Sequence, residues 1–397
     1  MTCRICEKES VDLLIDFGMQ PIVHAYLKSS DEKYPLYPFK LGYCKSCSFL
    51  QLMETISPDI LYKNYFTVSE WKNQPHIPHL INIIKSINGF DQKDSLLDIG
   101  CNDGSFLVSM SKSGYKNIYG IEPTLDSYKI ANDKGLNVHH GFFEERVAFD
   151  QYGKNRFDII TARQVLEHIS NLDDFMKGIS LVIKDDGCLI IEIPDSDWTY
   201  EYFDYALWEE HVNYFTINTI KNLMRKYSFD VIHHETTLFS GKALTVFCKK
   251  NRYLSGNLNC NTNDLNNAHR YKQYWPKFVE NLKYFIESKA TPVAIYGCGA
   301  RSSNFVNFSG VSNMIECFID DQPEKQKLYV PGCELKINRW EDECFKQHNI
   351  LLGVNTENEY KVINKRNLDI GKTYSILPPS QYLPDFWKKD IRGFSND

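Results

Sequence analysis

Residues 96–104 read Leu-Leu-Asp-Ile-Gly-Cys-Asn-Asp-Gly. The apolar residues predict a short buried strand that ends near Ile99, and the two glycines predict a tight turn that leads into a helix. We expect further strands at residues 118–121, 137–140, 157–162 and 187–193, and helices at residues 125–134 and 173–183. Because strands that alternate with helices usually pair in parallel, this segment predicts an α/β fold with a helix-covered sheet.

Acidic residues and glycines around this turn indicate the ligand. Asp98 lies at the end of the strand, where its carboxylate can reach a cationic amine, and Glu122 ends the next strand, where an acid suits ribose hydroxyls. Gly100 permits both the turn and the close approach of a ligand. The complete Gly-x-Gly-x-x-Gly of pyrophosphate-binding loops is missing, so the pattern favours S-adenosylmethionine (SAM) over NAD. The residues expected to hold SAM are Asp98, Gly100, Asn102, Gly104, Glu122, Phe142 and Arg163.

Two features after the later strands have alternative interpretations. Phe142 either holds the adenine ring or fills the core. Glu167 and His168 either act chemically or open a helix, where a glutamate is favoured by the helix dipole.

Two Cys-x-x-Cys pairs lie in the first part of the chain, at Cys3 and Cys6 and at Cys44 and Cys47. Each short spacer lets both sulfurs face one ion, so the pattern predicts tetrahedral zinc with four thiolate ligands. Four thiolates leave no open position, and the metal is therefore expected to stabilise a small segment rather than to catalyse. The other eight of the twelve cysteines are expected to be small buried hydrophobic residues.

The last part of the chain restarts the strand–glycine–helix pattern at residues 292–304, with further strands expected at 315–319 and 349–353. The N–H groups at such a helix start can receive phosphate, with Arg301 as the nearest cation. The alternative is a nucleotide-binding fold that is retained only for packing. An Asn-rich stretch at residues 254–267 marks a boundary. We expect domains at residues 1–58, 59–253 and 265–397.

Composition narrows the class of protein. The chain has 397 residues, 43% hydrophobic residues and a net charge of −6, which fits a globular protein of about two or three domains. The acidic balance and the lack of a basic stripe argue against a nucleic-acid partner. No run of about 18–20 apolar residues is present, nor an apolar signal-like start, so we expect no membrane partner and a cytoplasmic location. A monomer is expected.

With these motifs together, the chain resembles the family of SAM-dependent C-methyltransferases that act on nucleotide-linked deoxysugars. The matching segments are Cys3-x-x-Cys6, residues 16–21, Cys44-x-x-Cys47 with residues 48–51, Tyr62-x-x-Tyr65, the SAM loop, residues 210–216 and residues 294–302. The resemblance implies an N-terminal zinc-binding domain, a central class I methyltransferase domain with a Rossmann-like sheet, and a second Rossmann-like α/β domain at the C-terminus.

The resemblance also implies a reaction. A methyl group would pass from SAM to a ring carbon beside a keto group, C3 of a 4-keto sugar linked to TDP, GDP or CDP. His211 would remove the ring proton, which suits an imidazole at neutral pH, and Glu210 would orient or assist it. The resulting enolate would attack the methyl group. The residues implied to contact the substrate are Tyr62, Tyr65, Tyr214 and Arg301.

Departures from the family pattern leave alternatives open. The family has Tyr-His where this chain has Trp208-Glu209, and an indole can only donate a hydrogen bond. The family's lysine near residues 301–303 is also missing. An O-methyltransferase acting on a related sugar is therefore the main alternative. Two others are a nucleic-acid modifier, which the acidic charge opposes, and an inactive scaffold, which the intact SAM loop opposes.

Overall fold

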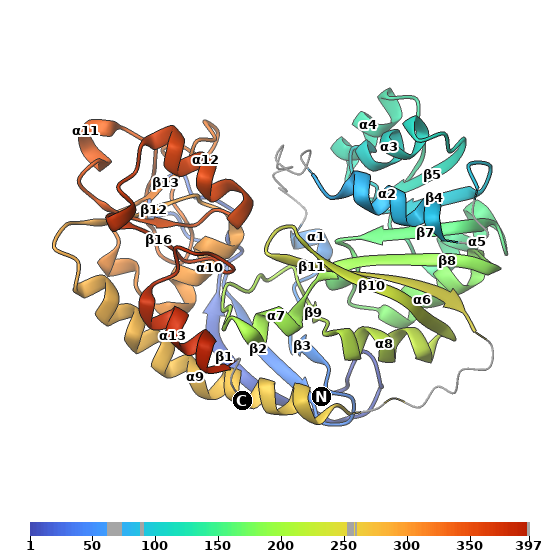
Figure 1. The fold of residues 1–397 in the computed structure, drawn as a ribbon, viewed down its shortest axis with the longest axis horizontal. Coiled ribbons are helices and arrows are strands. Elements are labelled where there is room, and N and C mark those ends of the chain that lie inside the picture. The colour runs from blue at the N-terminus through green and yellow to red at the C-terminus, as the bar shows by residue number, and fades with distance from the viewer. Residues whose placement is uncertain (62–73, 88–90, 252–257, 259, 395–397) are drawn as a thin grey trace.

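The structure, a computed structural model, describes residues 1–61, 74–87, 91–251, 258 and 260–394. It contains three β-sheets (Figure 1). Within the described residues, no helix combines the length and the apolar character that are needed to cross a bilayer.

The first sheet joins the start of the chain to a distant segment. Its four antiparallel strands, in spatial order, are β1 (Val11–Gln20), β2 (Tyr37–Cys44), β3 (Leu50–Leu52) and β9 (Asn213–Tyr214). In the pairing of β3 with β9, Leu50 lies opposite Tyr214 and Gln51 opposite Asn213. The N-terminal sheet therefore holds the residues that directly follow Val212. Helix α1 (Pro58–Leu61) follows β3 in the sequence.

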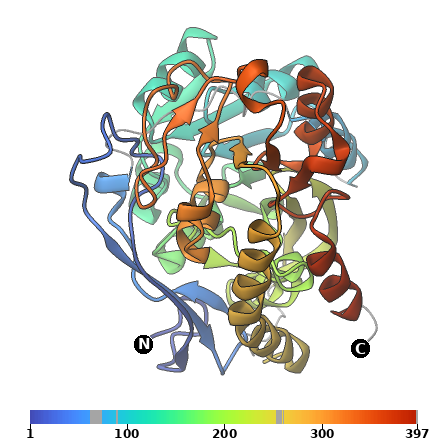
Figure 2. The same cartoon turned by 90° about the vertical axis from the view of Figure 1, so that its left-hand side faces the viewer.

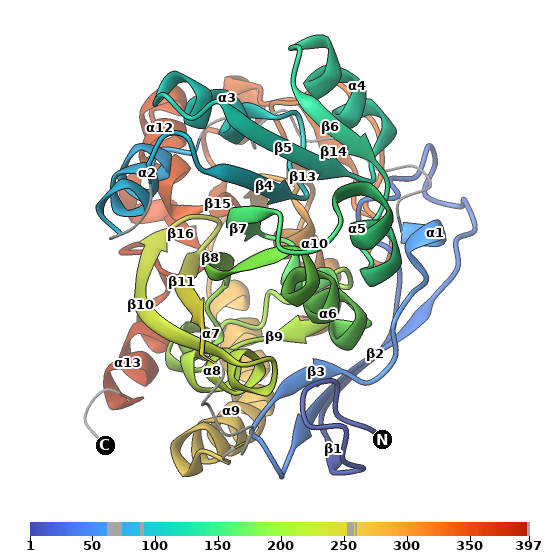
Figure 3. The same ribbon diagram turned by 90° about the vertical axis from the view of Figure 1, so that its right-hand side faces the viewer.

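The second sheet has seven strands, in the spatial order β10-β11-β8-β7-β4-β5-β6 (Figure 3). Its strands are β4 (Ser95–Ile99), β5 (Asn117–Glu122), β6 (Asn137–His140), β7 (Phe157–Arg163), β8 (Ile183–Pro194), β10 (Phe229–Leu238) and β11 (Lys242–Lys250). The helices of this part are α2 (Ile77–Ser86), α3 (Ser105–Lys112), α4 (Leu125–Asp133), α5 (Glu145–Tyr152), α6 (Leu172–Val182), α7 (Ser196–Glu201) and α8 (Ile217–Lys226). The strands β4 to β8 are parallel, and β11 runs antiparallel to both of its neighbours. The predicted Rossmann-like sheet is confirmed.

Both faces of this sheet are buried. Leu96 and Ile159 share a core with the apolar residues of α2 and α3, whereas Leu97 and Ile160 share a second core with those of α6 and α8. Strands that are covered on both faces read as continuous apolar runs, which explains why the sequence predicted them well.

The third sheet has five parallel strands in the spatial order β14-β13-β12-β15-β16. Its strands are β12 (Val293–Tyr296), β13 (Phe318–Ile319), β14 (Ile337–Asn338), β15 (Asn349–Leu352) and β16 (Thr373–Ser375). The helices are α9 (Thr262–Glu287), α10 (Ala300–Ser309), α11 (Asp342–Phe345), α12 (Thr356–Arg366) and α13 (Asp385–Phe394). The second Rossmann-like sheet is confirmed, although the strand expected at 315–319 covers only Phe318–Ile319.

One hydrophobic core joins the first and third sheets. Phe17 of β1 packs on Phe308 of α10 with ring centroids 4.4 Å apart, and Tyr205 stacks on Tyr271 of α9 at 4.4 Å. Helix α9 runs beneath the N-terminal strands and the C-terminal sheet (Figures 1 and 2). Because one continuous core links these parts, their relative positions are fixed by packing. The domain boundaries expected from the sequence stay predictions.

Candidate functional site

Two cavities meet at His211. The sheet cavity, of about 730 Å³, is lined by the loops that follow β4 and β7, and the interdomain cavity, of about 490 Å³, is lined by the loops that follow β8, β12 and β15. Trp208, His211 and Ser240 line both cavities. Ligands of doubly wound sheets bind at the carboxyl ends of the strands where the strand order reverses, and both cavities lie at such edges.

The loop after β4 requires its glycines. Gly100 has φ +69°, and a Cβ there would lie 2.5 Å from Val165 Cγ2. Gly104 precedes α3 with φ +76°, and a Cβ there would lie 2.3 Å from Leu136 Cδ1. Of the residues expected to hold SAM, Gly100, Asn102 and Arg163 line the sheet cavity, and their contact with SAM stays a prediction.

Asp98, at the end of β4, has one carboxylate oxygen without a hydrogen-bond partner among the described residues. Its side chain is buried, and Oδ1 accepts a hydrogen bond of 2.6 Å from the Thr161 hydroxyl. The other oxygen, Oδ2, has no hydrogen-bond partner among the described residues, and burial raises the pKa of Asp98 to about 6. A buried carboxylate oxygen without a partner favours a cationic ligand, and the methionine amine of SAM is such a group.

Glu122 holds the loop from the next strand. Its carboxylate accepts the N–H of Asn102 at 2.9 Å and the N–H of Thr124 at 2.8 Å. Carboxylate oxygens accept more than one hydrogen bond each, so this arrangement keeps capacity for ribose hydroxyls.

Phe142 does not line the sheet cavity. Its side chain is 49% exposed and is absent from the cavity lining, so the structure supports neither the adenine contact nor the core position expected from the sequence. Its neighbour Phe143 is the buried one, packed edge-on against Phe175. Ile130 supplies an apolar wall to the sheet cavity instead.

Two further acidic residues and a histidine line the sheet cavity. Glu167 and His168, expected either to act chemically or to open a helix, lie in the short 3₁₀ helix Leu166–His168, and both line the cavity. Neither Glu167 oxygen has a hydrogen-bond partner among the described residues, although Oε1 lies 4.0 Å from His168 Nε2, and burial raises the pKa of Glu167 to about 8. Glu192, at the end of β8, contacts His76 at 2.9 Å. The only sequence signal for these residues was their position at strand ends.

His211 is held between two rings. Its imidazole lies 4.9 Å from the ring of Trp208 and 4.9 Å from that of His168, measured between centroids. Burial, and then the positive charges of His168 and Arg301, lower the pKa of His211 well below its usual value. A neutral imidazole can accept a proton, so this environment suits a general base.

Glu210 does not contact His211 through its carboxylate among the interactions observed. It faces His24, whose Nδ1 lies 3.3 Å away, and His168, whose Nδ1 lies 4.0 Å away. Burial, followed by the charge of Glu209, raises the pKa of Glu210 well above its usual value. The backbone carbonyl of Glu210 also lies 3.0 Å from His168 Nδ1, which orients that ring against His211.

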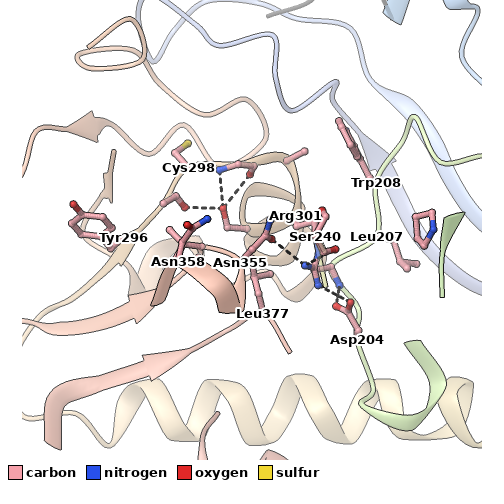
Figure 4. Close-up of a pocket in the computed structure, with 18 of the residues that line it drawn as sticks. Asp204, Leu207, Trp208, Ser240, Tyr296, Cys298, Arg301, Asn355, Asn358 and Leu377 are labelled. Atoms are coloured by element: carbon pink, nitrogen blue, oxygen red, sulfur yellow. Dashed lines mark hydrogen bonds and ion pairs between the residues drawn. The ribbon is translucent and has the colours of Figure 1, made fainter. Parts of the chain in front are cut away.

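The interdomain cavity contains the other predicted substrate residues that the structure describes. Arg301 pairs with Asp204 at 2.8 Å (Figure 4). Tyr214 donates its hydroxyl to the carbonyl of Trp208 at 3.3 Å. Cationic side chains from three elements also line this cavity, namely Lys242, Lys325, Lys361 and Lys365. Tyr62 and Tyr65 lie outside the described residues.

The four cysteines of the paired motifs converge. Cys3 Sγ lies 3.5 Å from Cys47 Sγ, Cys6 Sγ lies 3.6 Å from Cys44 Sγ, and all four sulfurs lie within 4.8 Å of one another. Tetrahedral zinc with bonds near 2.3 Å requires sulfurs about 3.8 Å apart, so the geometry fits a structural zinc ion. The expectation for the remaining cysteines was wrong at Cys260 and Cys344, which are exposed.

Removal of one thiolate tests the zinc assignment. Cys44→Ser should reduce bound zinc from one ion per chain and lower the melting temperature by at least about 5 °C, because metal binding contributes folding free energy. Metal content by plasma mass spectrometry and a thermal melt measure both. The exposed Cys344→Ser is the matched control, and an unchanged zinc content in Cys44→Ser would exclude the assignment.

Removal of the Asp98 carboxylate tests the SAM loop. Asp98→Ala should weaken SAM binding more than about 100-fold, because the ligand's amine loses its buried counter-charge. Titration calorimetry measures this affinity, with the exposed Asp186→Ala as the control. Affinity within threefold of the unmodified protein would contradict the assignment.

The charge state of His211 can be observed directly. The depressed pKa keeps the imidazole neutral, and protonation should begin only as the pH falls towards that pKa. The ring ¹⁵N signals of His211, assigned by comparison with His211→Asn, should therefore stay constant from pH 8 to pH 6.5. A midpoint at or above the ordinary histidine value of about 6.5 would refute this environment.

Three family models match consecutive parts of the chain. Residues 3–62 match the "Putative zinc binding domain", residues 76–234 match the "Methyltransferase domain", and residues 259–359 match the "C-methyltransferase C-terminal domain". The four converging cysteines lie in the first match, the SAM loop and His211 in the second, and Arg301 in the third.

Individual relatives cover smaller parts. C-methyltransferase NovU of Streptomyces niveus is 24% identical over 257 residues, which is 62% of this chain and 60% of that protein. The ubiquinone biosynthesis O-methyltransferase of Glaesserella parasuis is 28% identical over 125 residues, 28% of this chain and 52% of its own length. The crystal structure of a SAM-dependent methyltransferase from Archaeoglobus fulgidus covers 49% of this chain and 100% of its own, at 16% identity and a TM-score of 0.38. With the three domain matches in this order, the chain is similar to methyltransferases that combine a zinc-binding domain with a C-methyltransferase C-terminal domain.

Proposed function

We propose that the protein methylates a ring carbon of a keto-deoxysugar that is carried by a nucleoside diphosphate. The observation that carries the proposal is the position of His211 in the walls of both cavities, which puts a base between a site for SAM and a site for an acceptor. The match to a C-methyltransferase C-terminal domain and the likeness to a protein named a C-methyltransferase support transfer to carbon. The proposed acceptors are 4-keto sugars linked to TDP, GDP or CDP, with methylation at C3.

The methyl donor would occupy the sheet cavity. SAM supplies an electrophilic methyl group when it is bound. Asp98 would pair with the amine of its methionine part, and Glu122 would accept hydrogen bonds from its ribose. These two anchors lie at the ends of adjacent strands, so they would fix the direction of the ligand within the cavity.

The nucleotide of the acceptor would occupy the interdomain cavity. The first turn of α10 has N–H groups without partners inside the helix, which favour phosphate oxygens. Arg301 lies in this turn. Its guanidinium donates to Asp204, to the carbonyl of Ser240 and to Asn355 Oδ1 (Figure 4), and its five N–H groups exceed these three bonds. Lys242 and Lys361 add positive charge on the same walls. A diphosphate satisfies this arrangement better than a neutral sugar would.

His211 would perform the proton transfer. It would take the proton from the carbon beside the keto group, and the C–H electron pair would delocalise onto the keto oxygen as an enolate. The enolate carbon would then bond to the methyl carbon as the S–CH₃ bond breaks, which leaves S-adenosylhomocysteine. Tyr214 would position the loop that carries the base through its bond to the Trp208 carbonyl.

Product analysis with an isotope label tests this reaction. The protein is incubated in D₂O with SAM and a panel of 4-keto-6-deoxy sugars linked to TDP, GDP or CDP, and the products are identified by mass spectrometry and NMR. We expect a C-methylated product and, with S-adenosylhomocysteine in place of SAM, deuterium at the ring carbon beside the keto group. His211→Asn should slow both processes at least about 100-fold while SAM affinity is retained.

The exposed His269→Asn is the matched control. Methylation without deuterium exchange would point to O-methylation, because an oxygen nucleophile needs no carbon acid. Full turnover by His211→Asn would exclude His211 as the base, and the absence of product from every panel member would contradict the proposed substrate class.

A further inference from the structure

Glu209 precedes the Glu210-His211 pair, and the proposed reaction gives it no task. Its side chain is buried, with an exposure of 3%. A carboxylate loses favourable hydration on burial, so it is retained only where hydrogen bonds or charges compensate for that loss. The partners of Glu209 therefore indicate what it does.

Both oxygens of Glu209 accept a hydrogen bond, and the two donors come from opposite ends of the chain. Oε1 accepts the backbone N–H of Val23 at 3.0 Å, and Oε2 accepts Nδ2 of Asn304 at 2.9 Å. Val23 lies in the N-terminal part that also carries the cysteine cluster, whereas Asn304 lies in α10 of the C-terminal part. Both donors are fully buried. Glu209 is thus a bridge between the two flanking parts of the molecule.

Asn304 contacts the same loop at a second point. Its Nδ2 also donates to the carbonyl of Leu207 at 3.0 Å. One turn earlier in α10, Arg301 contacts Asp204 and the interdomain cavity. Helix α10 therefore links the wall proposed to hold the nucleotide with the backbone that positions Trp208 and His211.

His24 of the N-terminal part faces the two carboxyl groups of this loop. Glu209 and Glu210 are adjacent buried carboxyl groups, and burial raises the pKa of Glu209 to about 7. His24 lies beside both, with Nδ1 3.7 Å from Glu209 and 3.3 Å from Glu210. The N-terminal part therefore contributes a backbone donor and an imidazole to the loop that carries the proposed base.

We propose that Glu209 is a positioning residue, whose bonds to Val23 and Asn304 fix the Trp208–His211 backbone between the two cavities and connect α10 to the base. The inference rests on the proposed function, since it assumes that His211 removes the substrate proton. Glu209 itself touches neither ligand in this account.

Exchange of the two side-chain functions tests the bridge. Glu209→Gln keeps an acceptor for Val23 but places an amide N–H₂ against the amide of Asn304, and Asn304→Asp places two carboxylates together. Each variant should lower kcat and the deuterium-exchange rate about tenfold or more, because Glu209→Gln loses one buried hydrogen bond and Asn304→Asp loses two, those to Glu209 and to the carbonyl of Leu207. The double variant restores a donor and an acceptor, and it should recover at least threefold over Asn304→Asp alone.

The assay uses the panel sugar that the unmodified protein methylates, at pH 8, where Glu209 is ionised. SAM affinity, zinc content and the KM of the acceptor should change less than threefold, and the exposed Glu343→Gln is the matched control. Additive losses in the double variant, or kcat unchanged in Glu209→Gln, would overturn the positioning role. If the unmodified protein methylates no panel sugar, the proposed function fails instead.

A measurement without substrate keeps the inference testable in that case. Amide hydrogen exchange of peptides covering residues 206–214 should be faster in Glu209→Gln and in Asn304→Asp than in the unmodified protein, and slower again in the double variant. Unchanged exchange in both single variants would show that the bridge does not hold the loop.

Discussion

The account depends on the confinement of one loop, residues 207–214, where three parts of the chain meet. The carbonyl of Val212 accepts hydrogen bonds from the N–H of Leu52 at 3.0 Å and from Nη1 of Arg4 at 3.0 Å. The cysteine-containing part therefore holds the residue that follows His211. The N–H of Val212 donates to the carbonyl of Glu167 at 2.8 Å, which ties the same residue to the sheet that forms the proposed SAM site. A metal ion at the four cysteines can therefore influence the position of His211, although it lies away from the proposed reaction site. The link is Arg4, which lies between Cys3 and Cys6 and also holds the loop.

The burial of charged groups at this junction opposes folding and at the same time restricts the positions that the loop can adopt. Glu167, Glu209 and Glu210 are all buried, and burial raises the pKa of each of them. Buried carboxyl groups contribute little net stability. Among these three, Glu209 is the one whose two oxygens both accept a hydrogen bond within the described residues, and those bonds favour one position of the loop. The same desolvation keeps His211 neutral. The burial that destabilises these carboxylates thus also keeps the histidine in the neutral form, which can accept a proton.

Local sequence patterns predicted some features of the fold and of the candidate site, but other features depend on contacts between distant parts of the chain. The buried strand before Gly100, the acid at Asp98 and the spacing of Cys3 and Cys6 are short-range signals, and the sheet and the sulfur cluster follow from them. The pairing of β9 with β3 could not be predicted, because a two-residue strand has no periodicity and its partner lies far away in sequence. The misplacement of Phe142 has a similar cause, since the pattern cannot tell which of two adjacent aromatic residues faces inward when a loop changes direction. The bridging role of Glu209 depends on contacts with both flanking parts, and no local pattern contains them.

A crystal structure of the protein with S-adenosylhomocysteine and TDP tests the central claim most directly. The account predicts S-adenosylhomocysteine in the sheet cavity with its amine at Asp98, TDP in the interdomain cavity with its phosphates near the start of α10, and the imidazole of His211 between them. The two ligands in one cavity, or either ligand bound away from the cavity assigned to it, would contradict the account.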